Sequence, residues 1–267
     1  MKAGLATIAL RHHDIFHAVD LAAEAGFLGV EIWGRAPHTP DEFDENFTRR
    51  IREHVRGSGL EVCMFGSYAN PSSPDFEQKA PDALNIAKTL GTRLIRVWAG
   101  NKEPHEADDE LWSHVAASLH EFALRAEYDG ITLAIEMHCG TLCLTPEGSL
   151  RLIEEANAPN LKLNYQIADP SNPDAERVIG LIGDHVVNVH AQNRAPSALE
   201  GGKTELSWIE EGQIDYDQVL ALLAKHGFNG FVEAEFLKGE SVSEDAVLES
   251  LRKDAEYLRA LTAKYGS

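Results

Sequence analysis

The sequence predicts a single (β/α)8 barrel that spans residues 1–267. Short apolar segments typical of strands alternate eight times with longer segments of helical spacing, and this alternation indicates parallel strand pairing. Eight such units in a chain of this length fit a closed barrel better than an open, doubly wound sheet. No GxGxxG motif follows a strand and no GxxxxGKS/T motif is present, so the usual marks of nucleotide-binding sheets are missing.

The expected elements follow from apolar spacing and from residues that end helices. Gly26 and Gly91 each follow a segment of helical spacing, and glycine is common just past a helix C-terminus. Thr145 followed by Pro146 marks a helix start, because proline is favoured in the first turn. We expect strands at residues 1–9, 28–33, 60–65, 93–98, 131–136, 161–166, 185–190 and 231–235. We expect helices at residues 12–25, from the segment 40–46 to about 56, 75–89, 107–128, 145–156, 173–182, 215–226 and 244–265, with a polar loop from 191 to about 213.

The charge balance excludes two classes of partner. The chain has 43 acidic and 24 basic residues, for a formal net charge of −19. Nucleic acids and anionic lipids both attract positive charge, so we expect no nucleic-acid partner and no membrane contact. No apolar run reaches the ~18 residues that a membrane-spanning helix needs.

The N-terminus and the cysteines indicate a cytoplasmic protein. The apolar run in MKAGLATIAL is too short for a signal peptide, and no small-residue cleavage site follows it. Three cysteines are an odd number in a chain of this size, which favours a reducing compartment without a disulfide framework. Cys139 and Cys143 beside His138 suggest zinc, but no second cysteine pair lies nearby, so a loop is the better interpretation.

Charged residues end three segments that look like buried strands. ITLAIE ends on Glu136, VVNVH ends on His190 and FVEAE ends on Glu235. His138 lies two positions after Glu136 and therefore points the same way on a pleated strand. In barrels of this class catalytic groups sit at the C-terminal ends of the strands. We interpret these strand ends as the walls of one site, to which Glu31 is a further candidate.

A divalent metal would explain how carboxylates remain charged inside a barrel mouth, because an unpaired buried charge is costly. The predicted ligands are Glu136, Gln166, His190 and Glu235. Two carboxylates, an imidazole and an amide oxygen suit Mn²⁺, Mg²⁺ or Co²⁺, with water or substrate completing the coordination.

Each of these residues also has an ordinary structural alternative. Glu136 and Glu235 can form salt bridges with barrel arginines such as Arg96, and His190 alone can be a hydrogen-bonded core histidine. Glu31 can be a structural glutamate of the kind that ends many barrel strands. The occurrence of all of them at strand ends favours a shared site.

Several motifs, in their order and spacing, resemble the xylose-isomerase-like barrels. This superfamily contains sugar isomerases and epimerases together with the metal-dependent type of AP endonuclease. The resemblance covers nearly the whole chain and is specific for the superfamily rather than for a substrate. It rests on GFLGVEIWG, GSYANP, RVWAG, IEMH, VVNVH, EEGQIDY and GFNGFVEAEF.

The resemblance implies one divalent metal, usually Mn²⁺, with Mg²⁺, Co²⁺ or Zn²⁺ as alternatives. Its implied ligands are Glu136, the strand-six position, His190 and Glu235. Relatives often have aspartate on strand six, in a segment like NYD, where this chain has Gln166. A neutral amide removes one negative charge and predicts weaker metal binding, and Asn164 and Asp169 are alternative ligands.

The leading functional hypothesis is an isomerase or epimerase that acts on a keto sugar or a small hydroxy-ketone. Metal coordination would stabilise an enediolate, with Glu136 and Glu235 as acid and base. His138 and Arg194 are candidates to orient substrate oxygens, and the aromatic side chains of Trp33, Tyr68 and Trp98 are candidate walls of the pocket.

Three other functions are open. A lyase similar to 3-dehydroshikimate dehydratase would form the same enolate and then expel a hydroxyl group. A barrel that binds a sugar without converting it is made conceivable by Gln166. A nuclease is disfavoured by the negative charge and by the absence of additional strand-end histidines. The resemblance also implies that the barrel can form homo-oligomers.

Overall fold

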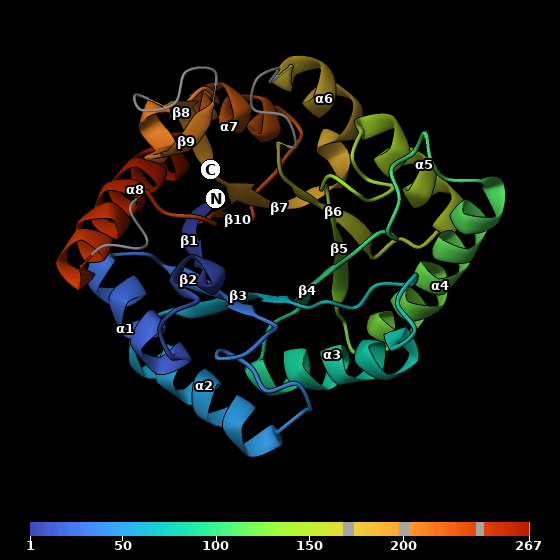
Figure 1. The fold of residues 1–267 in the computed structure, drawn as a ribbon, viewed down its shortest axis with the longest axis horizontal. Helices are drawn as coiled ribbons and strands as arrows, with labels where there is room; N and C mark the ends of the chain where they lie inside the picture. The colour runs from blue at the N-terminus through green and yellow to red at the C-terminus, as the bar shows by residue number, and fades with distance from the viewer. Residues whose placement is uncertain (168–173, 198–202, 239–242, 267) are drawn as a thin grey trace.

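The computed structural model describes residues 1–167, 174–197, 203–238 and 243–266. Eight parallel strands form a closed barrel in the order β1-β10-β7-β6-β5-β4-β3-β2, and the helices surround it (Figure 1). The ring closes because β1 pairs with β10 on one side and with β2 on the other. The predicted (β/α)8 barrel is therefore confirmed.

The barrel strands are short and end close to the expected positions. They are β1 (Lys2–Ala6), β2 (Gly29–Trp33), β3 (Glu61–Gly66), β4 (Leu94–Val97), β5 (Thr132–Glu136), β6 (Leu161–Tyr165), β7 (Val186–Ala191) and β10 (Phe231–Ala234). The first strand ends earlier than the sequence suggests, because Thr7–Leu10 forms a 3-10 turn, η1. Gln166 and Glu235 each lie one residue past their strand, at the barrel mouth.

The helices begin where the sequence supplies a capping side chain. They are α1 (Ile15–Ala25), α2 (Glu45–Gly57), α3 (Phe76–Leu90), α4 (Asp109–Tyr128), α5 (Pro146–Ala156), α6 (Ala175–Ile182), α7 (Tyr216–Lys225) and α8 (Glu244–Tyr265). The carboxylates of Asp14 and Asp108 accept hydrogen bonds from backbone N–H groups of the first turn of α1 and α4, and the Thr145 hydroxyl does the same for α5. Gly26 ends α1 with a φ of 93°, a conformation that glycine adopts at little cost.

The segment expected to be a polar loop contains a β-hairpin. β8 (Asn193–Pro196) pairs antiparallel with β9 (Thr204–Ser207), and the short helix η3 (Ile209–Glu211) follows. Asn193 is 1% exposed, and its amide nitrogen donates to the carbonyls of Ile209 and Ile214 at 2.7 and 2.8 Å. A buried side chain thus anchors the hairpin, which explains why its polar sequence did not indicate strands.

The apolar core lies between the barrel and its helices, where residues such as Ile32, Ile95 and Leu133 are fully buried. Parallel pairing turns the C-terminal ends of all eight barrel strands to one face of the ring. The three cysteines are free thiols. Among the described residues no helix combines the length and the apolar character needed to cross a bilayer.

Candidate active site

Six charged side chains meet at the C-terminal ends of the barrel strands, and we call them the mouth cluster. They come from β2, β4, β5, β7 and the end of β10, and each is at most 4% exposed. The closed parallel barrel brings these residues together although they are far apart in the sequence. The members are Glu31, Arg96, Glu136, His190, Glu233 and Glu235.

His190 lies at the centre of the mouth cluster. Its Nε2 is 2.6 Å from Glu31 Oε2 and 3.4 Å from Glu233 Oε2. Its Nδ1 is 3.3 Å from Glu136 Oε1 and 3.5 Å from Glu235 Oε1. Burial alone would lower the pKa of His190, but the charges of Glu31 and Glu235 outweigh it and raise the pKa well above the ordinary value. Each ring nitrogen therefore faces its own pair of carboxylates.

Arg96 binds Oε2 of Glu136, the oxygen that does not face His190. One guanidinium nitrogen donates to Glu136 Oε2 at 2.6 Å, and the other donates to the carbonyls of Gly66 and Ser67 at 3.2 and 3.1 Å. Burial acts to raise the pKa of Glu136, but the charge of Arg96 outweighs it and lowers the pKa to about 2. Glu136 is thus held ionised, and the Arg96 pairing considered for it from the sequence is present.

Glu31 fits against a glycine of the neighbouring strand. A Cβ atom at Gly66 of β3 would lie 2.0 Å from Glu31 Oε1, so any larger residue there would displace the carboxylate. Burial acts to raise the pKa of Glu31, whereas the charge of His190 and its hydrogen bond lower it, and the net shift is downward. Glu31 is thus positioned to accept the Nε2 proton of His190.

Glu233 is the member of the cluster that the sequence reasoning missed. Its Oε2 accepts a hydrogen bond from Asn188 at 3.0 Å, and its Oε1 accepts one from the Cys63 thiol. Burial, reinforced by the charge of Glu31, raises the pKa of Glu233 to about 7. The segment FVEAE could have indicated Glu233. Residues two apart on a strand point to the same face, so Glu233 and Glu235 lie on one face of the barrel strand.

Glu235 is held by two neutral amides. Gln166 and Gln192 both donate from their Nε2 atoms to Glu235 Oε2, the second at 3.1 Å. Gln166 is therefore brought to the cluster, but its amide nitrogen rather than its oxygen faces the carboxylate. The alternative ligand Asn164 is fully buried on β6 and accepts a hydrogen bond from another asparagine, while Asp169 lies outside the described residues.

The charges and donor atoms of the mouth cluster fit a divalent cation. Its four carboxyl groups outnumber its two cationic groups, Arg96 and the His190 imidazolium, although the raised pKa of Glu233 leaves that carboxyl partly protonated near pH 7. Ligand atoms of Glu136, His190 and Glu235 lie within 4.8 Å of one another, on the Nδ1 side of the imidazole. The hydrogen bond between Nε2 and Glu31 is of the kind that orients metal-binding histidines. Three of the four predicted ligands therefore converge, with Gln166 beside them.

The family model for xylose isomerase-like TIM barrels matches residues 19–261, which is most of the chain. The protein belongs to this family.

Three similar proteins illustrate the range of this family. A protein named 3-dehydroshikimate dehydratase from Bacillus anthracis is 28% identical over 243 residues, covering 82% of this chain and 86% of that protein. A solved xylose isomerase-like TIM barrel protein from Mycobacterium smegmatis, in complex with magnesium, has a TM-score of 0.78 at 14% identity and covers 100% and 98% of the two chains. A D-tagatose 3-epimerase-like protein has a TM-score of 0.75 at 22% identity and covers 99% of each chain. The two structures show the shared fold, and the three names include a dehydratase and an epimerase-like protein.

The three predicted aromatic residues of this xylose isomerase-like barrel form a wall beside the mouth cluster. Trp33 Nε1 donates to the Tyr68 hydroxyl at 2.9 Å, and the rings of Tyr68 and Trp98 stack with centroids 5.9 Å apart. The guanidinium of Arg96 lies 5.0 Å from the centroids of both stacked rings. We call Trp33, Tyr68 and Trp98 the aromatic wall.

His138 and Arg194, the two residues expected to orient substrate, are placed differently. The half-buried ring of His138 packs edge-on against Trp98 at 5.0 Å, next to the aromatic wall. His138 Nδ1 lies 2.7 Å from the carbonyl of Cys139, so Nδ1 is the hydrogen-bond donor, and in the neutral ring the lone pair is on Nε2. Arg194 donates to the hydroxyl and carbonyl of Thr204 across the β8–β9 hairpin.

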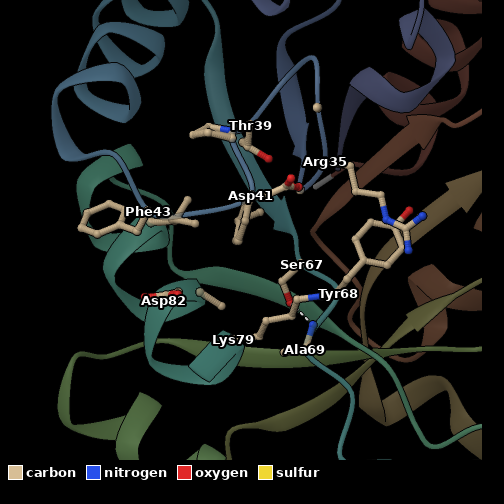
Figure 2. A pocket seen from close by; sticks show the side chains of 15 residues that line it. Arg35, Thr39, Asp41, Phe43, Ser67, Tyr68, Ala69, Lys79 and Asp82 are labelled. Carbon is tan, nitrogen blue, oxygen red and sulfur yellow. Dashed lines mark hydrogen bonds between the residues drawn. The ribbon is translucent and has the colours of Figure 1, made fainter. Parts of the chain in front are cut away.

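Two cavities adjoin the aromatic wall at the loops that follow β2 and β3. The larger has a volume of about 430 Å³ (Figure 2) and the smaller about 300 Å³. Both are lined in part by Arg35, Tyr68 and Lys79. The two cavities therefore form a more open rim beside the aromatic wall.

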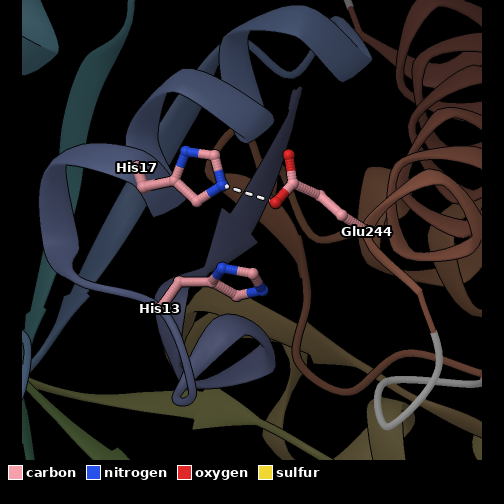
Figure 3. Close-up of side chains that lie close together, drawn as sticks. All are labelled: His13, His17 and Glu244. Atoms are coloured by element: carbon pink, nitrogen blue, oxygen red, sulfur yellow. Dashed lines mark ion pairs between the residues drawn. The ribbon is translucent and has the colours of Figure 1, made fainter.

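A second group of metal-ligating side chains lies at the surface, and we call it the surface cluster. It consists of His13, which precedes α1, His17 in the first turn of α1, and Glu244 at the start of α8 (Figure 3). His17 Nε2 is 3.3 Å from Glu244 Oε2, and the two histidine ring centroids are 5.1 Å apart. The side chains of His17 and Glu244 are 38% and 62% exposed, in contrast to the mouth cluster.

Proposed function

We propose that this barrel removes the proton next to the carbonyl group of a small hydroxy-ketone and converts the resulting enediolate to the isomeric carbonyl compound. The observation that supports this proposal best is the convergence of Glu136 and Glu235 on one nitrogen of His190. That arrangement provides a cation site and a proton-transfer carboxylate within the same few ångströms. A divalent cation held by Glu136, His190 and Glu235, Mn²⁺ in the first instance and otherwise Mg²⁺, Co²⁺ or Zn²⁺, would stabilise the negative charge that develops on the substrate oxygens.

The two carboxylates have different surroundings, and this difference assigns their roles. Arg96 lowers the pKa of Glu136 to about 2, so Glu136 keeps its charge and cannot hold a proton to return it. Glu235 receives hydrogen bonds from the neutral amides of Gln166 and Gln192 instead of an arginine. We therefore assign proton removal and return to Glu235. One base that moves a proton between adjacent carbons performs an isomerisation, whereas an epimerisation usually needs a base on each face of the substrate.

Dehydration of a keto-acid is the second candidate. His138 presents the free lone pair of Nε2 beside Trp98, so it can take a proton from a substrate carbon on its own side of the site. Expulsion of a hydroxyl group from the same enolate then gives the eliminated product. The similarity to a protein named 3-dehydroshikimate dehydratase favours this candidate as well.

Isotope exchange tests the shared step, and product analysis separates the two candidates. We would incubate the protein, loaded with Mn²⁺, in D₂O with a panel of ketoses and with 3-dehydroshikimate. Deuterium in the carbon next to the carbonyl, measured by NMR, reports proton removal. An isomeric sugar supports the leading proposal, whereas ultraviolet absorption of an eliminated product supports dehydration.

The variant Glu235→Gln should lose deuterium exchange, because an amide cannot accept the proton. Glu127→Gln, at an exposed position near the end of α4, is the matched control and should exchange at the wild-type rate. Absence of exchange with every ketone, with Mn²⁺ demonstrably bound, would refute the enzyme proposal and favour a barrel that only binds its ligand.

A further inference from the structure

The smaller cavity at the rim contains one cation whose charge is not matched. Its lining consists of Arg35, Tyr68, Asn70, Ser73, Lys79 and Trp98, and its volume is about 300 Å³. Lys79 Nζ lies 2.7 Å from Asp75, so its charge is already paired. Within the described parts of the chain, no carboxylate lies within ion-pair distance of Arg35.

The polar side chains of Asn70 and Ser73 in this lining already have partners within the protein. The side-chain oxygen of Asn70 accepts from the backbone N–H groups of Ser72 and Gly100, and its nitrogen donates to the Gly100 carbonyl. The Ser73 hydroxyl donates to Asp75. Within the described lining, the guanidinium of Arg35 and the indole Nε1 of Trp98 are therefore the donors that remain available to a ligand, and of these two only the guanidinium carries a charge.

Stacking holds the Arg35 guanidinium in a defined position. Its central carbon lies 3.6 Å from the centroid of the Tyr68 ring, and Figure 2 shows the two side chains lying alongside each other. The Tyr68 ring is itself fixed by the hydrogen bond from Trp33. A stacked arginine keeps its N–H donors in a planar fork that matches the two oxygens of a carboxylate.

The cavity is connected to the mouth cluster through ring contacts. Tyr68 stacks on Trp98, and Trp98 contacts His138, which follows β5 two residues after Glu136. The Tyr68 ring also contacts both Arg35 of the cavity and Arg96 of the mouth cluster, so the aromatic wall borders the two regions.

The charge distribution indicates that the carboxylate of an acidic substrate would bind at the cavity of Arg35 rather than at the mouth cluster. With a divalent cation held at His190, the carboxylates of the mouth cluster would balance that cation and Arg96, so a substrate carboxylate would gain no net attraction there. At the rim the same carboxylate would meet an unmatched guanidinium. We infer that the cavity at Arg35 is the subsite for a carboxylate of the substrate. This inference rests on the proposed function and narrows its substrate class to hydroxy-keto acids.

A matched pair of ligands tests the subsite by binding alone. We would measure the dissociation constants of 3-dehydroshikimate and of its uncharged methyl ester by calorimetry, with the Mn²⁺-loaded protein. The wild type should bind the acid about 10- to 100-fold more tightly than the ester, which is the usual range for a charged hydrogen-bonded pair. Arg35→Gln should abolish this preference without changing the affinity for the ester, and Arg35→Lys should restore part of it.

Arg50→Gln provides the control variant, because Arg50 of α2 is also an exposed arginine, and its guanidinium carbon lies 5.1 Å from the centroid of the Phe16 ring on α1. It should keep the preference of the wild type. Equal binding of acid and ester, binding of neither, or a preference that survives Arg35→Gln would overturn the inference. Deuterium exchange with neutral ketoses that is unaffected by Arg35→Gln would leave the proposed reaction standing while the subsite fails. A preference for the acid that depends on Arg35, without deuterium exchange on any substrate, would support the subsite and refute the proposed reaction.

Discussion

Two buried carboxylates, Glu136 at the barrel mouth and Asp254 on α8, have the same exposure and opposite pKa shifts. Each residue is 1% exposed. Glu136 faces Arg96 at 2.6 Å, and its pKa is lowered to about 2. Asp254 accepts a hydrogen bond from the backbone N–H of Ile209 at 2.9 Å, and its Oδ2 has no partner among the described residues. Burial raises the pKa of Asp254 to about 7.

The difference shows that burial does not by itself determine the charge of a carboxylate. Desolvation raises the pKa of both groups, and only an adjacent cation reverses the shift. Asp254 is therefore a structural acid that is largely protonated in mildly acidic solution. Glu136 remains an anion at every ordinary pH, which is the state that cation binding requires.

Removing the Arg96 guanidinium should shift the pKa of Glu136 upward, in the direction seen for Asp254. We expect Arg96→Met to lower the free energy of unfolding by about 3–5 kcal/mol at pH 7, because Glu136 is then left as a buried charge without its guanidinium partner. The pKa of Glu136 should rise because only His190 would remain as a cation beside it, so the deficit should grow as the pH increases from 4 to 7. Urea unfolding of the metal-free protein across this range measures both effects.

The control for Arg96→Met is Arg125→Met, which removes an exposed pair between Arg125 and Glu121 on α4. Its cost should be below about 1 kcal/mol and independent of pH over the same range. Equal losses in the two variants would mean that the Arg96 pair contributes no more than a surface pair.

Asp254→Asn should remove a pH dependence from the wild type. The folded pKa of Asp254 is about 7 and that of an unfolded aspartate is about 3.9, so between these values the folded state holds one more proton. Stability contributed by this group is therefore present below pH 4 and is lost as the pH rises to about 7. A shift of three pKa units corresponds to about 4 kcal/mol as an upper limit. Asparagine cannot lose this proton, and its Oδ1 can still accept from Ile209.

Thermal or urea unfolding at a series of pH values would show whether Asp254→Asn flattens the curve. The variant should match the wild type near pH 4 and exceed it by roughly 2–4 kcal/mol at pH 8. Glu249→Gln, at an exposed position of the same helix, should leave the slope unchanged. A wild-type slope that persists in Asp254→Asn would assign the titration to another group.

The sequence indicated the mouth cluster well because strand ends can be located from apolar patterns. Glu136, His190 and Glu235 lie close together, since parallel strands that end on polar residues present them on one face, while their roles in a site stay a prediction. Pairings across the barrel could not be read in the same way. The sequence offered Arg96 as a partner for either Glu136 or Glu235. The choice between them, like the pairing of the carboxylates with each nitrogen of His190, depends on side-chain directions that strand order alone does not give.

Loops limited the sequence prediction in two other places. The hairpin β8–β9 is stabilised by the buried amide of Asn193 rather than by an apolar face, so its segment had no strand pattern. Arg35 is a loop arginine, and its significance depends on stacking with Tyr68 and on the lack of a carboxylate partner in the described structure. Neither feature has a signature in the spacing of residues.

We expect the smallest change in stability from a variant of the surface cluster, whose charged pair is exposed rather than buried. Its pair between His17 and Glu244 is 38% and 62% exposed, so water already solvates both groups. We expect Glu244→Gln to change the free energy of unfolding by less than about 0.5 kcal/mol and to leave Mn²⁺ affinity at the mouth cluster unchanged. Urea unfolding and calorimetric titration with Mn²⁺ measure these quantities. Solvent screening should keep the contribution of an exposed histidine–carboxylate pair small. A loss of more than about 1 kcal/mol in Glu244→Gln would contradict this expectation, because the exposed pair would then contribute as much as a buried one.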